Sequence, residues 1–314
     1  MISEPGLNFL LPTNSVLRTG TDSRSVCFYW SIAFGDWRGH FVAVTFLPVM
    51  ERELRAKARG RGVYWTRFAV GLIGVFICLP QLFVPPVLSR GMITGHVTFQ
   101  GMVGAGFLLC CSACWLTADA ISAERREGTL GLLLLTRVRF LDLLFGKLGS
   151  AGATVLGALL TLLPVLTVPL LAGGVTGGEI FREGLALLDA LFFSLAAGLV
   201  ASVYMRQRFA ALGAAATVVV LVSVVPYFLW VQSTWLEGMF SPLVAVVAAN
   251  DAQYKRSAVP YWAAVVMVQL MAWGLVVVAG RRLREMTQNL ECLGDDAEWQ
   301  RRWADRSWRK ERVR

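Results

Sequence analysis

Few residues of this 314-residue chain have the types and spacings that an enzyme site requires. The two histidines lie far apart, with His40 in the N-terminal leader and His96 in a predicted outer loop. No H-E-x-x-H motif or Cys/His set has the spacing of a zinc site. The stretch FGKLGS contains a Gly-Lys pair, but Leu148 follows the lysine where a phosphate-binding loop needs Ser or Thr. We therefore expect a chain without catalytic residues that binds no cofactor or metal of its own.

The cysteines and the acidic residues of the apolar stretches give little indication of a catalytic or metal site. The run CCSAC has a C-x-x-C spacing, but it lies in an apolar segment without a partner pair, which favours small apolar packing over metal or redox chemistry. Among the charges inside the predicted spans, only Asp189 qualifies as a trace of an ion path. We expect a structural role for Asp189, or pairing with Arg182, ahead of a role in transport.

The most unusual feature is a cluster of four charged residues, the run ERRE at residues 124–127, in an otherwise apolar region. Gly128 is a natural helix stop, and Thr129 is a good N-cap for a following helix. The LGLLLLT that comes next makes about two helical turns, which is too short to cross a bilayer and too apolar to face water. We predict a short cytoplasmic helix whose leucines need a groove, either in the helical bundle or in a partner.

Composition places these residues in a membrane. The chain is 56% hydrophobic and only 16% charged, too little charge to cover a soluble domain of this length. Its apolar residues fall in blocks of about twenty, the length that crosses a hydrocarbon core, and none alternates with the period of a barrel strand. We predict an all-α integral membrane protein with six transmembrane helices, at residues 68–88, 97–118, 148–172, 184–204, 209–230 and 261–279.

Positive charge is distributed unevenly between the connecting segments. If the N-terminal region, the 119–147 loop, the 206–208 turn and the tail share one side, that side holds 26 of the 30 Lys and Arg. The positive-inside rule then places both termini in the cytoplasm, for a multi-pass protein of the cell (plasma or inner) membrane. The net charge of +9 also suits an anionic inner leaflet, so we expect membrane lipid and no nucleic acid as a partner.

Three regions follow from this pattern. Residues 1–46 form an interfacial or disordered leader, residues 47–280 hold the six spans, and residues 281–314 form a basic, Trp-containing cytoplasmic tail. Before the first span, two acid-first i,i+4 pairs, Glu51 with Arg55 and Glu53 with Lys57, predict an amphipathic helix that lies along the membrane surface. For the tail, attachment to a surface and a solvated, partly disordered segment both remain open.

The stretch SAERREGTLGLLLLTRVRFLDLLFGKL resembles the cytoplasmic signature of permease subunits of type-2 ABC (ATP-binding cassette) exporters. That signature has the form E-R-E-x-G-T-L-E-x-L-L-x-T-P, followed by a Gly-Lys that opens the third span. LPVMERELRAKARGRG similarly resembles the connecting helix before the family's first span. The sequence departs from the pattern, because Gly131 stands where an acid is common and Arg137 where a proline is common. The residues on which the resemblance rests are Glu124, Glu127, Gly128, Thr129, Leu130, Leu133, Thr136, Gly146 and Lys147.

The resemblance implies that the 119–147 loop is a coupling element. It would dock on a separate ABC ATPase subunit that binds ATP and Mg²⁺, and a second copy or a homologous permease would complete the translocation path. The implied coupling residues are Glu124, Arg125, Glu127, Gly128, Thr129, Leu130, Leu133 and Lys147, and those of the connecting helix are Glu51, Arg52, Glu53, Arg55 and Lys57.

Two other functions stay open at this point. One is a non-transporting membrane anchor or assembly subunit. The other is an intramembrane enzyme, against which the lack of paired acids and of histidines in the predicted spans counts. The transported substrate is not indicated by any motif.

Overall fold

The structure is a computed structural model that describes residues 50, 51, 53–55, 60–83, 91–126, 140–232 and 238–311. Within these ranges, only the backbone is described at residues 81–83, 91–94, 125, 140–142 and 286–311. The regular elements in these ranges are helices, and six segments are long and apolar enough to cross a membrane. The prediction of a helical chain with six helices that can span a membrane is therefore confirmed for the described residues. The six segments are Arg61–Pro80, Gly95–Glu124, Leu143–Ala172, Gly177–Tyr204, Arg208–Gln232 and Val259–Glu285.

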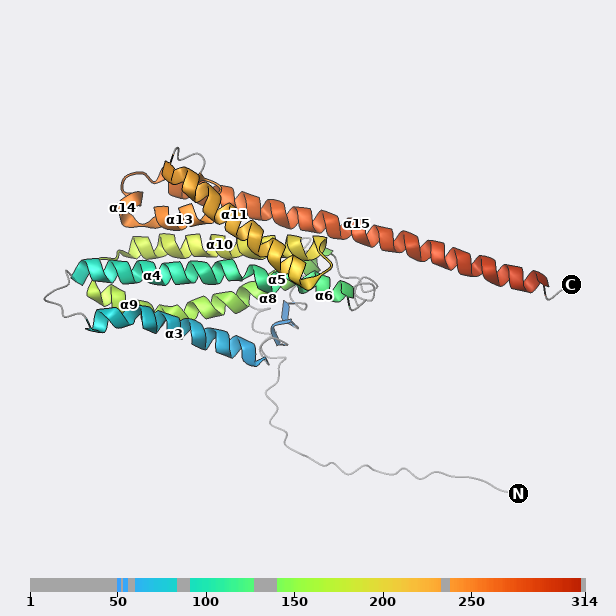
Figure 1. Cartoon of the computed structure of the whole chain (residues 1–314), viewed down its shortest axis with the longest axis horizontal. Helices are drawn as coiled ribbons and strands as arrows, with labels where there is room; N and C mark the ends of the chain where they lie inside the picture. Colours follow the sequence, from blue (N-terminus) through green and yellow to red (C-terminus); the bar gives the residue numbers. More distant parts are fainter. Residues whose placement is uncertain are drawn as a thin grey trace, which may run out of the picture. The chain divides into compact units, whose positions relative to one another are not determined.

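Figure 1 shows how the helices are arranged, with α10 between α4 and α15. Span two consists of α4, α5 and α6 in succession, and span three consists of α8, the 3₁₀ turn η1 and α9. Pro164 follows that turn, where its missing N–H and its ring prevent a continuous α-helix. The bounds are α3 Arg61–Phe83, α4 Gly91–Ser112, α5 Cys114–Ala118, α6 Ala120–Arg126, α8 Phe140–Leu159, η1 Leu160–Leu162, α9 Leu163–Ala172, α10 Gly177–Tyr204, α11 Arg208–Gln232, α13 Pro242–Ala249, α14 Asp251–Tyr254 and α15 Val259–Glu311.

The centre of the bundle is α10, which contacts α4, α5, α11, α13 and α15. Small residues let these helices approach closely. Close approach is needed because lipid provides no hydrophobic force between helices, so van der Waals packing must hold them together. At Gly198 an added Cβ would overlap Thr117 Oγ1 and the Cys114 carbonyl. On α15 one buried stripe faces the bundle at helical spacing, formed by Tyr261, Ala264, Val268, Ala272, Val276, Ala279 and Leu283.

Two serines of α10 supply hydrogen bonds where span two is interrupted. Ser194 Oγ accepts from the Cys114 amide at 3.0 Å and donates to the Cys111 carbonyl at 2.9 Å. Ser202 Oγ accepts from the amides of Ile121 and Ser122, at 2.8 and 3.0 Å. Backbone groups freed by a helix break inside a membrane need such partners, so these serines stabilise the breaks between α4, α5 and α6.

Several helix boundaries differ from the predicted ones, and two of these differences have a clear consequence. α10 begins at Gly177 instead of residue 184, because the Thr176 side chain caps it by accepting from the Glu179 amide at 3.2 Å. α15 continues through the polar tail to Glu311 instead of ending near residue 280, and its 53 residues have a length of about 80 Å. The predicted leader at residues 1–46 lies outside the described residues.

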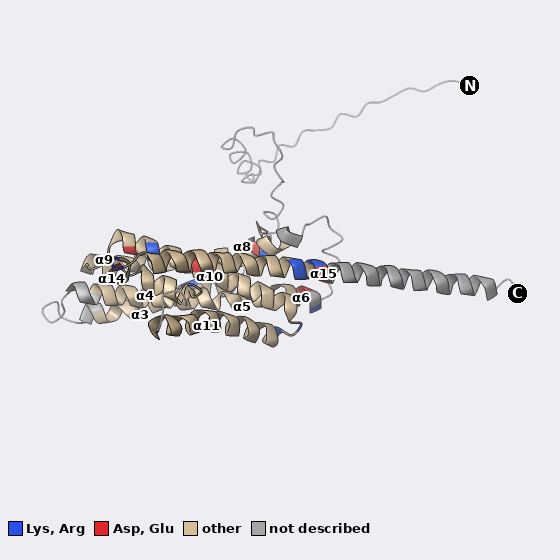
Figure 2. Ribbon diagram, turned by 90° about the horizontal axis from the view of Figure 1, so that it is seen from above, with Lys and Arg blue, Asp and Glu red and all other residues tan. Residues whose placement is uncertain are grey.

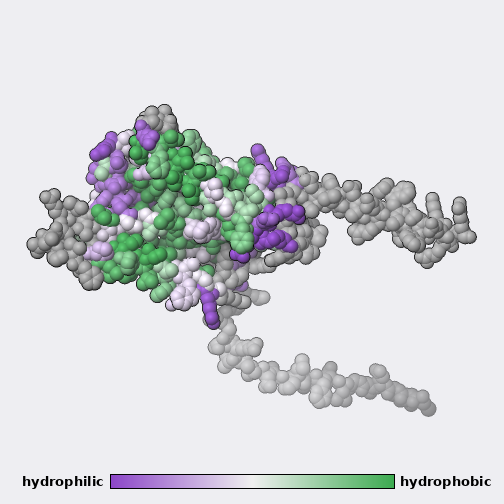
Figure 3. All heavy atoms as spheres, in the orientation of Figure 1, coloured by the Kyte–Doolittle hydropathy of each residue, from purple (hydrophilic) through white to green (hydrophobic). Residues whose placement is uncertain are grey.

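The surface of the described part is apolar between two more hydrophilic regions (Figure 3). Large apolar side chains are exposed on several helices, among them Phe76 of α3, Leu171 of α9 and Phe209 of α11. A soluble domain rarely exposes so much apolar surface, whereas lipid tails solvate it. The exposed faces therefore agree with a helical bundle in a bilayer.

Candidate functional site

Three charged residues from separate elements meet at one end of the bundle. The Lys147 ammonium of α8 lies 2.8 Å from Glu124 Oε1 at the end of α6, and 3.9 Å from Glu53 Oε1 of the segment that precedes α3. The side chains of Lys147 and Glu124 are only 10% and 16% exposed. A charge so far out of water needs a partner of opposite sign, so the lysine holds these elements together. We call Glu53, Glu124 and Lys147 the charged triad.

Packing next to the charged triad explains how the segment before α3 reaches α8. Met50 is half-buried, and a Cβ added at Gly149 would lie 2.8 Å from its sulfur. The glycine therefore leaves room for Met50 beside the first turns of α8. Glu51 and Arg55 face outward and form an exposed pair at 2.5 Å, which confirms one of the two predicted i,i+4 pairs.

A second ionic network ties α6 to the turn between α10 and α11. Asp119 Oδ1 accepts from Ser122 Oγ at 2.6 Å and from an Arg126 nitrogen at 2.7 Å, and its Oδ2 lies 3.4 Å from Arg208 Nε. Arg126 also donates to the Arg206 carbonyl at 3.4 Å. In Figure 2 the ribbon is coloured for charged residues at α6 and on α15 toward the same end of the bundle. The loops predicted to be cytoplasmic thus share one end of the bundle.

The predicted coupling and connecting residues are described only in part. Glu53, Glu124 and Lys147 are brought together, although no local sequence pattern predicts that they pair. The possible partner that was predicted for Glu53, Lys57, lies outside the described residues. So do Arg52, Glu127, Gly128, Thr129, Leu130, Leu133 and the side chain of Arg125. The coupling helix, the amphipathic helix and the coupling role therefore stay predictions.

Asp189 lies inside the bundle, 5% exposed. With the Gln269 amide turned so that its nitrogen faces the acid, that nitrogen donates to Asp189 Oδ1 at 2.7 Å and its oxygen accepts from Trp273 Nε1 at 3.2 Å. The other oxygen, Oδ2, is buried without a hydrogen-bond partner among the described residues. The predicted pairing with Arg182 is wrong, because Arg182 binds Asp251.

The opposite end of the bundle contains a buried polar cluster that the sequence reasoning missed. Glu179 and Glu183 of α10 are 0% and 1% exposed. Glu179 Oε1 lies 3.1 Å from His96 Nε2 and accepts from Gln100 Nε2 at 3.3 Å, and the same amide donates to Glu183 Oε1 at 3.4 Å. The statement that Asp189 is the only charge in a span is therefore wrong, as is the placement of His96 in a loop. The sequence signal that could have revealed this cluster is Thr176, a good N-cap residue, because a helix that begins there includes both Glu179 and Glu183.

Arg182 of α10 points away from this cluster, toward α14. It forms an ion pair with Asp251, donates to the Ala249 carbonyl at 3.0 Å and stacks 4.1 Å from the centre of the Tyr254 ring. Burial alone would raise the pKa of Asp251, but hydrogen bonds from Lys255, Arg182 and Thr176 outweigh it and lower that pKa from its usual 3.8. Asp251 is therefore a charged, structural anchor for α14.

Comparison with known proteins leaves the family open: no family model matches the sequence, and no curated protein matches it. Within the described ranges, no group of three or more His, Cys, Asp or Glu is arranged to hold a metal ion. Function must therefore be inferred from the residues themselves and from where the fold places them.

Proposed function

We propose that this chain is the transmembrane subunit of an ATP-driven exporter of the type-2 ABC class, coupled to a separate ATPase subunit. The observation that carries the proposal is the ion pair between Lys147 and Glu124. These residues stand on either side of residues 127–139, the segment with the signature-like sequence. A loop whose two ends are tied together moves as a unit, as a coupling element must.

Glu53 adds a third attachment to the same point. Its carboxylate lies 3.9 Å from the Lys147 ammonium, so the segment before span one is connected to the ends of spans two and three. In a coupled transporter, a push on the loop would thereby reach three helices at once. A simple membrane anchor has no use for such a connection, which favours the transporter over that alternative.

The remaining parts of the proposal follow from the resemblance. ATP and Mg²⁺ bind the partner ATPase, which docks on the 127–139 loop at the cytoplasmic face of the cell membrane. A second copy or a sister permease completes the path, and the two halves rock against each other as ATP binds and leaves. Both termini of this chain lie in the cytoplasm.

The test needs the ATPase encoded next to this gene, recognised by a Walker A motif and an ABC signature. Both proteins are co-expressed, purified in lipid discs and weighed by light scattering. We expect two permeases with two ATPases, and ATP hydrolysis that disappears when the Walker A lysine is replaced. A permease that remains free of this ATPase, or that transports in vesicles without any ATPase, would contradict the proposal.

A further inference from the structure

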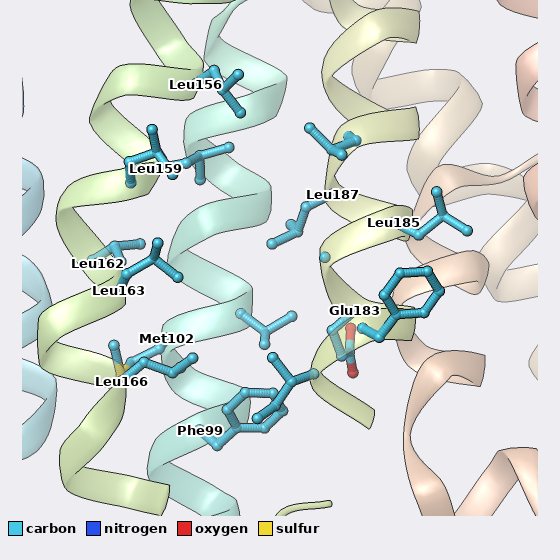
Figure 4. A pocket seen from close by; sticks show the side chains of 16 residues that line it. Phe99, Met102, Leu156, Leu159, Leu162, Leu163, Leu166, Glu183, Leu185 and Leu187 are labelled. Carbon is cyan, nitrogen blue, oxygen red and sulfur yellow. The ribbon is translucent and has the colours of Figure 1, made fainter. Parts of the chain in front are cut away.

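A cavity of about 400 Å³ lies between α4, span three and α10 (Figure 4). Leucines from span three and α10 form most of its wall, and Phe99 and Met102 of α4 complete it. Three lining residues, Leu160, Leu163 and Phe181, are more than half exposed, so the cavity is open at the apolar flank of the bundle. A ligand can therefore enter from the lipid side, and the volume is that of a typical small-molecule site.

Among the described residues that line the cavity, Glu183 is the only charged one. Its side chain is 1% exposed, and Figure 4 shows it among the apolar side chains of the lining. One carboxylate oxygen, Oε1, accepts the long 3.4 Å hydrogen bond from Gln100. The other, Oε2, is buried and has no hydrogen-bond partner in the described part of the chain. Half of this carboxylate is thus without a hydrogen-bond partner among the described residues.

The charged neighbours of Glu183 on α10 form their ion pairs with other residues. Glu179 lies one turn away on the same face of α10 and adds a second acid, for which His96 is the nearby partner. Arg182 is already bound to Asp251 and stacked on Tyr254. In the part of the chain that the structure describes, no cation forms an ion pair with Glu183. A buried carboxylate without one requires a proton or a cationic ligand.

We propose that this cavity binds an amphiphile with an amine head group. The ammonium donates to Glu183 Oε2, and the hydrocarbon chain lies along the leucines of span three and α10. Such a ligand satisfies the charge and the apolar wall together, whereas a neutral chain satisfies only the wall. The ligand is either a free hydrophobic amine or a lipid with an amine head. This inference goes beyond the proposed transport function, because binding requires no ATPase.

The test uses the purified full-length protein in nonionic maltoside micelles. Native mass spectrometry counts the molecules bound per chain as dodecylamine is titrated, and dodecanol serves as the uncharged match. We expect one dodecylamine per chain, bound at least roughly tenfold tighter than dodecanol, because a charge-assisted hydrogen bond is lost with the alcohol. Equal binding of the two probes would overturn the proposal.

Variants locate the site. Glu183→Gln keeps the size of the side chain but removes its charge, and should weaken dodecylamine binding at least roughly tenfold while leaving dodecanol unchanged. The matched control is Glu285→Gln, which removes an exposed acid at the opposite end of the bundle. Leu187→Trp fills the cavity, keeps Glu183 and should prevent binding of both probes. Unchanged dodecylamine binding in either cavity variant would overturn the proposal.

A second pair of probes identifies the source of the amine. Phosphatidylethanolamine has an amine head, and phosphatidylglycerol, with a similar chain region, lacks one. Selective binding of the former, weakened by Glu183→Gln, assigns the site to a membrane lipid. Binding of dodecylamine alone, with the same dependence on Glu183, assigns it to free hydrophobic amines.

Discussion

The Lys147 ammonium lies 2.8 Å from the Glu124 carboxylate, and the residues between these two include the whole 127–139 segment. Glu124 ends span two and Lys147 lies near the start of span three, so the pair fixes the separation of the two helices at this end. Since both side chains are largely buried, neither charge can be satisfied by water if the other is removed.

Reversing the Lys147 charge should destabilise the protein. Lys147→Glu places an acid beside Glu124 and Glu53, and we expect a loss of about 3 kcal/mol, the usual cost of breaking a buried pair. The charge exchange Lys147→Glu with Glu124→Lys restores opposite signs and should recover more than half of that loss. Chemical unfolding in maltoside micelles gives the free energy of unfolding for each variant.

The control for this cycle is the exposed pair of Glu51 and Arg55. Arg55→Glu should change the free energy of unfolding by less than about 1 kcal/mol, because water screens exposed pairs. If the charge exchange at positions 124 and 147 were no more stable than the single variants, the pair would not connect the two helices.

The loop itself should be needed for coupling but not for insertion. We predict that Glu127→Lys lowers transport and uncouples it from ATP hydrolysis while the protein still accumulates in the membrane, because the implied contact with the ATPase is charged. Leu133→Asp should act in the same way by preventing the leucines from docking. The measurement is transport against hydrolysis in vesicles that contain the ATPase, and unchanged coupling in both variants would remove this loop from the mechanism.

The six spans were predictable because the apolar blocks are long and bilayer thickness sets their length. The start of α10 was not predicted correctly because Glu179, Arg182 and Glu183 made residues 177–183 read as a polar loop. In the structure the Thr176 cap begins the helix there, and His96, Gln100 and Asp251 provide partners for these charges. Such partners come from distant parts of the chain, which no local pattern contains.

The charged triad illustrates the same limit. The sequence identified Glu53, Glu124 and Lys147 separately, each within a stretch that resembles a family motif. Their meeting depends on how α3, α6 and α8 pack, and on the space that Gly149 leaves for Met50. Tertiary packing of this kind is set by many apolar contacts together. The individual residues were predictable, whereas their contacts were not.

Gly198 should tolerate no side chain. In Gly198→Ala the new methyl would overlap Thr117 Oγ1 and the Cys114 carbonyl, so α10 and α5 must separate, and we expect a loss of about 1–3 kcal/mol of unfolding free energy. Gly213→Ala in α11 is the matched control, because nothing lies within 4 Å of its Cβ position. That variant should be neutral or slightly more stable, since alanine favours helix. Equal effects of the two changes would argue against the close approach.

The Asp251 anchor should make stability depend on pH. Its folded-state pKa lies below the usual 3.8, so its stabilisation is present above that value and disappears as pH falls through the lowered pKa. Asp251→Asn should therefore have a lower unfolding temperature than the unchanged protein at pH 7. The difference should shrink as pH falls below about 4. A difference that stays constant down to pH 3, with Glu285→Gln as the exposed control, would contradict this assignment.

The final prediction concerns orientation in the membrane, and the structure selects the positions for the probes. Gly238 is unsuitable, because a Cβ there would overlap the Trp230 ring, whereas Gly177 has open space. Gln207 is exposed in the turn at the other end of the bundle. In a background with Cys27→Ser and Cys292→Ser, a membrane-impermeant maleimide should label Gly177→Cys in intact cells. It should label Gln207→Cys only after the membrane is permeabilised, because the positive-inside rule places that turn in the cytoplasm.

Cys78, Cys110 and Cys114 are buried in the bundle and should not react, and the half-buried Cys111 is replaced by serine in the same background. Labelling of Gln207→Cys in intact cells would reverse the orientation, and with it the side on which an ATPase can dock.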